Sequence, residues 1–111
     1  MIVRISSTGV SESRVGAYRE FLESSVIPRY ETSPGMVRVS LLERQLVAYV
    51  EMLTVSLWQS REQLQQFLEN LQLSMESQKL VEDAKRKYGV IEVESRTFEV
   101  VLSREANQQN H

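Results

Sequence analysis

The chain has 111 residues, of which 41% are hydrophobic and 25% are charged, as in an ordinary single globular domain. A net charge of −2 gives no large field to attract nucleic acid, and the absence of cysteine excludes disulfides, a thiol nucleophile and thiolate metal ligands. The N-terminus has no signal-peptide pattern, and the longest mostly apolar stretch, residues 46–57, is too short to span a bilayer as a helix. We therefore expect a cytoplasmic protein that binds neither nucleic acid nor membranes.

The first segments predict a strand followed by a helix. Residues 2–5 are mostly β-branched and favour a short strand. Ser11 or Ser13 can cap a following helix, because a serine oxygen accepts a bond from a free N–H of the first turn. Pro28 removes a backbone donor, so the helix is expected to end or kink nearby. The apolar stripe of this helix has three- and four-residue spacing and consists of Val15, Tyr18, Leu22 and either Val26 or Ile27.

The central part of the chain predicts a pair of strands. The Pro34-Gly35 pair indicates a turn, and residues 36–42 then alternate between apolar and polar side chains. Residues 43–45 are polar and short enough to connect a hairpin. Residues 46–58 are largely apolar on both faces of the predicted strand. An antiparallel strand with one face exposed to solvent should instead carry polar residues on that face. Helices of the same chain can cover one face, so we expect a second subunit to cover the other.

The last third predicts a long helix and a final strand. Ser60 and Gln63 form a capping-box pattern before an apolar stripe, and the helix extends over residues 61–88 with a break expected near residues 74–77. Gly89 is typical of a helix C-terminus. The stripe consists of Leu64, Phe67, Leu68, Leu71, Met75, Leu80, Val81 and Ala84.

Strand material follows at residues 90–93 and 97–102, as one bent strand or two pieces. The order β-α-β-β-α-β predicts an α+β, ferredoxin-like subunit: an antiparallel sheet with two helices on one face. We expect a single domain over residues 1–102 and a polar C-terminal tail over residues 103–111.

Two runs of residues resemble a known family. Residues 33–39 read Ser-Pro-Gly-Met-Val-Arg-Val, and residues 55–64 read Val-Ser-Leu-Trp-Gln-Ser-Arg-Glu-Gln-Leu. These runs resemble the antibiotic-biosynthesis-monooxygenase-like family of dimeric α/β barrels. In that family a helix ends in Pro-Gly, and a later strand ends in Trp, followed by a polar pair, Glu and a long helix. The resemblance implies a homodimer joined through its sheets, with a cavity between each sheet and its helices.

The resemblance also implies a choice of chemistries. Some relatives oxidise quinol-type aromatics without metal or flavin, others degrade haem, and many have no known activity. The haem-degrading relatives use a histidine on the second helix and an asparagine near the end of the first strand. In this chain the only histidine is His111, and Ser6 and Ser7 stand near the end of the first strand. These departures argue against haem degradation, and we expect no metal and no cofactor.

Five residues are candidates for a substrate pocket, with Arg4 considered beside one of them, although no motif assigns a catalytic residue. Trp58 could stack on a planar substrate or simply fill the core. Glu51, within an apolar strand, could act as a general acid or base or pair with Arg38 or Arg4. Tyr18 and Tyr49 could offer hydroxyls to a bound aromatic, or they could pack in the core with their hydroxyl groups in contact with solvent. Arg38 and Arg4 could stabilise an anionic intermediate or lie on a solvated strand face.

Two functions of different classes remain open from the sequence. The first is a cofactor-independent, monooxygenase-like oxidoreductase that acts on an aromatic small molecule, for which a closed apolar cavity beside Trp58 is the expected sign. The second is a non-catalytic dimeric module that binds a small molecule or a protein.

Overall fold

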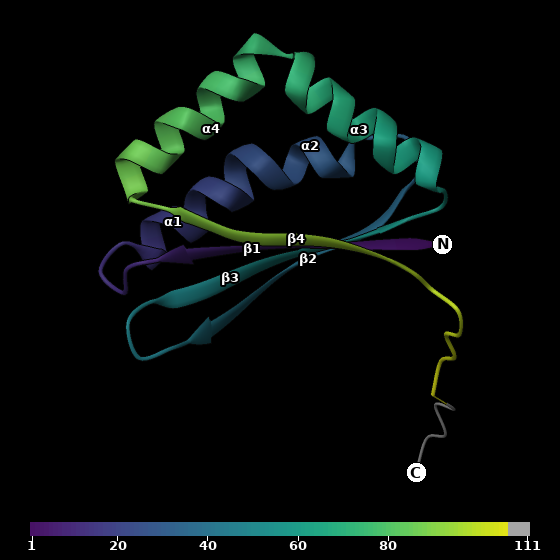
Figure 1. The fold of residues 1–111 in the computed structure, drawn as a ribbon, viewed down its shortest axis with the longest axis horizontal. Helices are drawn as coiled ribbons and strands as arrows, with labels where there is room; N and C mark the ends of the chain where they lie inside the picture. Colours follow the sequence, from purple (N-terminus) through teal and green to yellow (C-terminus); the bar gives the residue numbers. More distant parts are fainter. Residues whose placement is uncertain (107–111) are drawn as a thin grey trace.

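The computed structural model describes residues 1–106, which form a four-stranded antiparallel sheet with every helix on one face (Figure 1). The strands are β1 (Ile2–Val10), β2 (Met36–Gln45), β3 (Val50–Trp58) and β4 (Ile91–Glu99), in the sheet order β2-β3-β1-β4. The helical segments are α1 (Val15–Phe21), the π-helical turn η1 (Leu22–Val26), α2 (Ile27–Glu31), α3 (Arg61–Leu73) and α4 (Met75–Tyr88). The predicted α+β, ferredoxin-like subunit is confirmed.

The first helical segment continues through Pro28 without ending there. A proline ring clashes with the carbonyl four residues earlier, and the wider π-helical turn immediately before Pro28 accommodates it. The helix begins after Arg14, whose side chain makes no cap, so neither Ser11 nor Ser13 caps it as predicted. Instead the Ser11 carbonyl accepts the Arg14 N–H at 3.0 Å, which makes a turn at the helix entrance.

The β2–β3 hairpin turns later than the sequence predicts. Residues 43–45 belong to β2, and the connection is residues 46–49, closed by a 2.9 Å bond from the Leu46 N–H to the Tyr49 carbonyl. Val47 is fully exposed at its tip. The polar residues 43–45 lie on an edge strand, where charged side chains are common, so their polarity did not mark the turn.

The long helix is broken at Ser74, within the predicted interval. The Ser60 side chain accepts the Gln63 N–H at the start of α3, as the capping box predicts, and the Ser74 side chain does the same for Ser77 at the start of α4. The break turns Met75 outward, where 85% of it is exposed, so its predicted place in the apolar stripe is wrong. Gly89 ends α4 with a positive φ of 63°, as predicted.

The final strand is a single element with an irregularity. The register of β4 against β1 shifts between Ser7 and Thr8, which leaves Val93 as the extra residue of a bulge. The strand ends at Glu99, and residues 100–106 form no helix or strand. The division into a domain over residues 1–102 and a tail over residues 103–111 stays a prediction, and most of that tail, with His111, lies outside the described residues.

The helix-covered face of the sheet holds the core in two clusters. The first consists of Ile2, Tyr30, Trp58, Leu64 and Phe67. The second consists of Val10, Tyr18, Leu22, Val50 and Met52. These residues come from the central strands β1 and β3 and from α1, η1, α2 and α3, so each cluster joins distant parts of the chain.

The opposite face of the sheet carries no helix among residues 1–106 (Figure 1). On the two central strands this open face is largely apolar. Its residues on β1 and β3, identified by the strand register, are Val3, Ile5, Ser7, Glu51, Leu53, Val55 and Leu57. On the edge strands Leu42 and Phe98 are 50% and 46% exposed. A continuous apolar face of this kind is unusual on the surface of a monomer.

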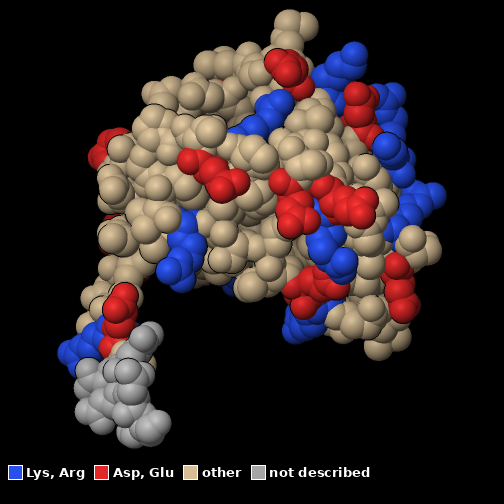
Figure 2. Space-filling model, turned by 180° about the vertical axis from the view of Figure 1, so that it is seen from behind, with Lys and Arg blue, Asp and Glu red and all other residues tan. Residues whose placement is uncertain are grey.

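The outer surface otherwise shows mixed charge. On the face seen in Figure 2, acidic and basic side chains are interspersed, as the net charge of −2 suggests. None of the helices within residues 1–106 combines the length and the apolar character that crossing a membrane requires.

Candidate functional site

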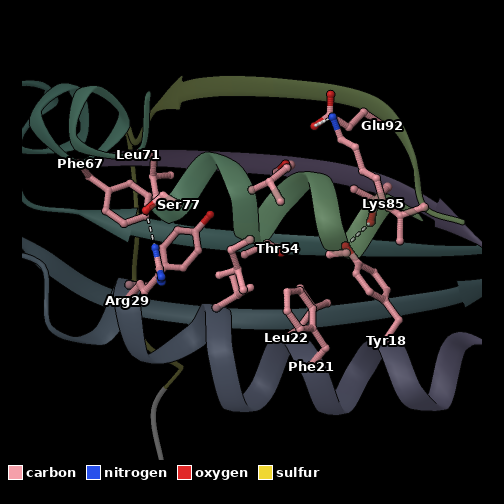
Figure 3. A pocket seen from close by; sticks show the side chains of 18 of the residues that line it. Tyr18, Phe21, Leu22, Arg29, Thr54, Phe67, Leu71, Ser77, Lys85 and Glu92 are labelled. Atoms are coloured by element: carbon pink, nitrogen blue, oxygen red, sulfur yellow. Dashed lines mark hydrogen bonds and ion pairs between the residues drawn. The ribbon is translucent and has the colours of Figure 1, made fainter. Parts of the chain in front are cut away.

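A cavity of about 210 Å³ lies between the sheet and the helices, where the two core clusters meet (Figure 3). Tyr18 and Leu22 belong to one cluster, and Tyr30 and Phe67 to the other, so both clusters contribute to its wall. The apolar part of the wall consists of Phe21, Leu22, Val26, Phe67, Leu71, Leu80, Val81, Ala84 and Val90. A dry cavity of about 150 Å³ holds one benzene ring, so this cavity has room for a compact ring system.

Two buried tyrosines place hydroxyl groups at the cavity. The Tyr18 hydroxyl lies 3.4 Å from the Thr8 hydroxyl on β1. Tyr30 packs against Phe67 with ring centroids 4.6 Å apart. Both tyrosines are only 6% exposed. Hydroxyls held by packing in an apolar wall are well suited to orient a polar atom of a ligand.

Burial raises the pKa of both tyrosines. For Tyr18 the Thr8 hydroxyl acts in the lowering direction, and the Glu92 charge adds a smaller rise. For Tyr30 the nearby Arg4 guanidinium acts in the lowering direction but is outweighed by burial. Both hydroxyls therefore stay protonated at neutral pH and serve as hydrogen-bond donors.

These shifts predict how stability depends on alkaline pH. Because the pKa is higher in the folded state, the unfolded chain loses these protons first, so their contribution to stability is present below about pH 10 and lost above it. Melting temperatures measured from pH 8 to 12 should fall less steeply for Tyr30→Phe than for the parent. Tyr49→Phe, outside the cavity, is the matched control and should keep the parent slope. Equal slopes in all three proteins would contradict the prediction.

Charged groups occupy both ends of the cavity (Figure 3). At one end Lys85 and Glu92 pair at 3.3 Å. At the other end Arg29 on α2 donates to the Ser77 hydroxyl on α4, and its distance to Glu76 is 3.9 Å. Arg4, on the helix-covered face of β1, also lines the cavity, where it donates to the Ser95 hydroxyl at 3.2 Å.

Trp58 does not line the cavity. Its side chain is fully buried, its N–H donates to the Ser56 hydroxyl at 3.0 Å, and its ring packs against Phe67 at 5.0 Å and Tyr30 at 6.4 Å. A cavity is present, but it is partly open to solvent rather than closed, and the aromatic residues of its wall are Tyr18, Phe21, Tyr30 and Phe67. Trp58 supports that wall from behind, so stacking of Trp58 on a ligand is not part of this geometry.

Of the other four candidates, only Tyr18 lies at the cavity, and Arg4, considered beside Arg38, lies there too. Arg38 is exposed and lies opposite Leu57 in the register, on the open face. Glu51 is on the open face too, where it pairs with Arg44 at 2.9 Å and accepts the Ser7 hydroxyl at 3.3 Å. The sequence suggested Arg38 or Arg4 as its partner, but the hairpin register places Arg44 directly opposite Glu51.

Tyr49 lies in the hairpin connection, away from the cavity. Its ring covers Gly9 so closely that a Cβ there would come within 2.8 Å of the ring. Gly9 thus leaves room for the ring against β1, and Tyr49 is not among the residues that line the cavity.

Sequence reasoning missed the polar residues Arg29, Tyr30, Thr54 and Ser77 of the cavity. The signal for Tyr30 was present, because Tyr18, Leu22, Val26 and Tyr30 continue one stripe at four-residue spacing. The predicted stripe stops at Val26 or Ile27, because Pro28 indicates that the helix ends or kinks nearby. Within residues 1–106, no group of three or more His, Asp or Glu side chains is placed to hold a metal ion.

Comparisons with known proteins agree on the fold. No protein-family model and no curated protein matches the sequence. Among solved structures, a protein from Deinococcus radiodurans, provisionally assigned as an antibiotic biosynthesis monooxygenase, matches with a TM-score of 0.73 and 13% identity over 96% of this chain and 99% of its own. A dimeric ferredoxin-like protein from an uncultured marine organism matches with a TM-score of 0.73 and 12% identity over 96% of this chain and 100% of its own.

A third solved structure is a mutant of SnoaB, a cofactor-independent oxygenase from Streptomyces nogalater. It matches with a TM-score of 0.62 and 12% identity over 92% of this chain and 95% of its own. The chain therefore has the ferredoxin-like fold of antibiotic-biosynthesis-monooxygenase-like structures, as its sequence resemblance predicted. At these identities the likeness extends to the fold and not to the reaction.

Proposed function

We propose that this protein is a homodimeric, cofactor-independent oxygenase that oxidises a compact quinol-type aromatic in the cavity beside Tyr18 and Tyr30. The observation that carries the proposal is an apolar cavity of about 210 Å³ with two protonated tyrosine hydroxyls and Arg4 in its wall. The name of SnoaB, which shares the fold, supports the reaction class.

The reaction draws all its electrons from the substrate and oxygen. An ionised quinol transfers one electron to O2, and the resulting superoxide and semiquinone combine to form a C–O bond. Loss of water from this peroxide breaks the O–O bond, so a quinol and O2 give a hydroxyquinone and water. The protein's part is to exclude bulk water and to stabilise the substrate anion, for which the Arg4 charge and the tyrosine donors are suited.

The homodimer rests on a separate observation. The open face of the sheet presents Val3, Ile5, Leu53, Val55 and Leu57 as one apolar surface on the central strands. A second copy can cover this face with the same residues, because two-fold symmetric interfaces are self-complementary. A dimeric protein with the same fold supports this arrangement.

The test is oxygen uptake with a naphthoquinol, corrected for its spontaneous oxidation, with mass spectrometry of the product under labelled oxygen. We expect one labelled oxygen atom in the hydroxyquinone. Tyr18→Phe should lower kcat by about tenfold or more, as expected when one donor to a developing anion is lost. Tyr49→Phe, a tyrosine outside the cavity, should keep the parent rate. No uptake above the spontaneous rate with any one- or two-ring quinol would reject the oxygenase.

The non-catalytic module is the second candidate, and the position of Trp58 favours it. The aromatic residue expected at the substrate is fully buried behind the wall, and the candidate carboxylate Glu51 lies on the other face of the sheet. Saturable binding of a naphthoquinol without catalysed oxygen uptake would assign this function.

A further inference from the structure

The cavity that the proposed function uses has an unusual balance of charge. Its wall contains three cationic side chains, Arg4, Arg29 and Lys85, and one carboxylate, Glu92. Lys85 and Glu92 neutralise each other at one end, since they pair at 3.3 Å. Arg4 and Arg29 are then the two cationic side chains of the wall whose charge Glu92 does not neutralise.

Arg4 forms no ion pair with a carboxylate in the described part of the chain. The hydrogen bond that its side chain makes is to a neutral group, since it donates to the Ser95 hydroxyl at 3.2 Å. A guanidinium has five donors, so this bond leaves it with unused capacity. A charge that is partly buried without an opposite charge is costly unless something else compensates it.

Arg29 is only weakly neutralised. The nearest carboxylate oxygen, on Glu76, is 3.9 Å away, and the Glu76 side chain is 88% exposed. An exposed pair at this separation contributes little, because water screens it. The Arg29 side chain is 32% exposed and donates to the Ser77 hydroxyl, which fixes it at the cavity wall.

The two arginines act on the same end of the cavity. Arg29 and Tyr30 are consecutive residues of α2. Arg4 lies opposite Ser56 in the sheet. The Ser56 hydroxyl accepts the N–H of Trp58, whose ring lies 6.4 Å from the Tyr30 ring. The Tyr30 ring in turn packs on Phe67, which lies at the Arg29 end in Figure 3. A ligand at this end therefore meets positive charge from the sheet on one side and from α2 on the other.

We infer that the quinol-type ligand of this cavity is also an aromatic acid of one or two rings, with its carboxylate held by Arg4 and Arg29 and its rings against Phe21, Leu22 and Phe67. The guanidinium fork matches a carboxylate better than any neutral group does. The volume of about 210 Å³ sets the size limit, since about 150 Å³ suits a single ring. This inference names the substrate class of the proposed oxygenase and rests on that use of the cavity.

The test is calorimetric titration with naphthoate and with naphthamide, its neutral counterpart of nearly the same shape. We expect naphthoate to bind at least about tenfold more tightly, the smallest gain typical of a charged hydrogen bond. Arg4→Met and Arg29→Met should each remove that preference and leave naphthamide binding unchanged. Arg61→Met, on the outer side of α3 and paired with Glu99, is the control and should keep it.

The outcomes separate the two proposals. Equal binding of acid and amide would overturn the anionic ligand while keeping the cavity as an aromatic site. Binding of neither compound, by a protein whose melting curve shows that it is folded, would reject both the ligand class and the cavity as the site of oxygenation. Should Arg4→Met fail to fold, Arg4→Gln decides: it removes the charge but keeps a polar side chain, so an unchanged preference for the acid would argue against carboxylate recognition by Arg4.

Discussion

Replacing Trp58 with alanine is expected to lower the free energy of unfolding by about 3–5 kcal/mol, the usual range for removing a large buried aromatic. Trp58 is fully buried, packs against Tyr30 and Phe67, and satisfies the Ser56 hydroxyl with its N–H. The change creates a cavity and leaves a buried hydroxyl without that donor. Most domains have only about 5–15 kcal/mol of stability, so a large part of the total would be lost.

Thermal unfolding followed by circular dichroism measures this effect, and a fall in melting temperature of roughly 10 °C or more is expected. Trp58→Phe keeps an aromatic ring and should lose clearly less. Val47→Ala, at the fully exposed hairpin tip, should change nothing measurable. A loss for Trp58→Ala no larger than that of Val47→Ala would show that Trp58 is not a central packing residue.

The second large effect is expected at the open face of the sheet. Val55 lies on central strand β3, opposite Ile5 on β1 and Ser40 on β2, and so sits at the middle of the proposed dimer interface. Val55→Asp would bury a carboxylate there without a partner, which costs several kcal/mol in each subunit. We expect the dissociation constant of the dimer to rise by at least about a hundredfold, which corresponds to roughly 2.7 kcal/mol.

Light scattering over a range of protein concentrations measures the mass of parent and variant. The parent should be a dimer at micromolar concentration, and Val55→Asp should be a folded monomer. Gln66→Asp adds the same charge on an exposed position of α3 and should remain dimeric. A monomeric parent would refute the interface, and a dimeric Val55→Asp variant would place it elsewhere.

The fold was largely predictable from the sequence because its signals are local. The capping box at Ser60, the αL glycine at Gly89 and the break near Ser74 each depend on a few neighbouring residues, and all three are confirmed. The errors arose where tertiary packing decides. Residues 43–45 at the polar end of β2 pair with residues 50–52 at the start of β3. The turn therefore lies at residues 46–49 and not at residues 43–45.

The candidate site was less predictable, because its residues come together only through the sheet register and the crossing of helices. Glu51 and Trp58 are chemically conspicuous in the sequence, yet they lie on opposite faces of β3 and neither lines the cavity. The sequence does not mark Arg29 as a candidate site residue, because it directly follows Pro28, where the helix is expected to end or kink. Its proximity to Ser77, 48 residues away, depends on how α2 packs beside α4.

The break at Ser74 separates two tasks that a continuous helix would combine. The buried apolar residues of α3 are Leu64 and Phe67 of the Trp58 cluster, whereas α4 buries only Ser77 and Ala84. Yet α4 supplies more of the cavity wall than α3 does, through Ser77, Leu80, Val81, Ala84 and Lys85. Within this helix pair α3 packs the Trp58 cluster and α4 lines more of the cavity, so substitutions on α4 can reshape the cavity while the Trp58 cluster stays intact.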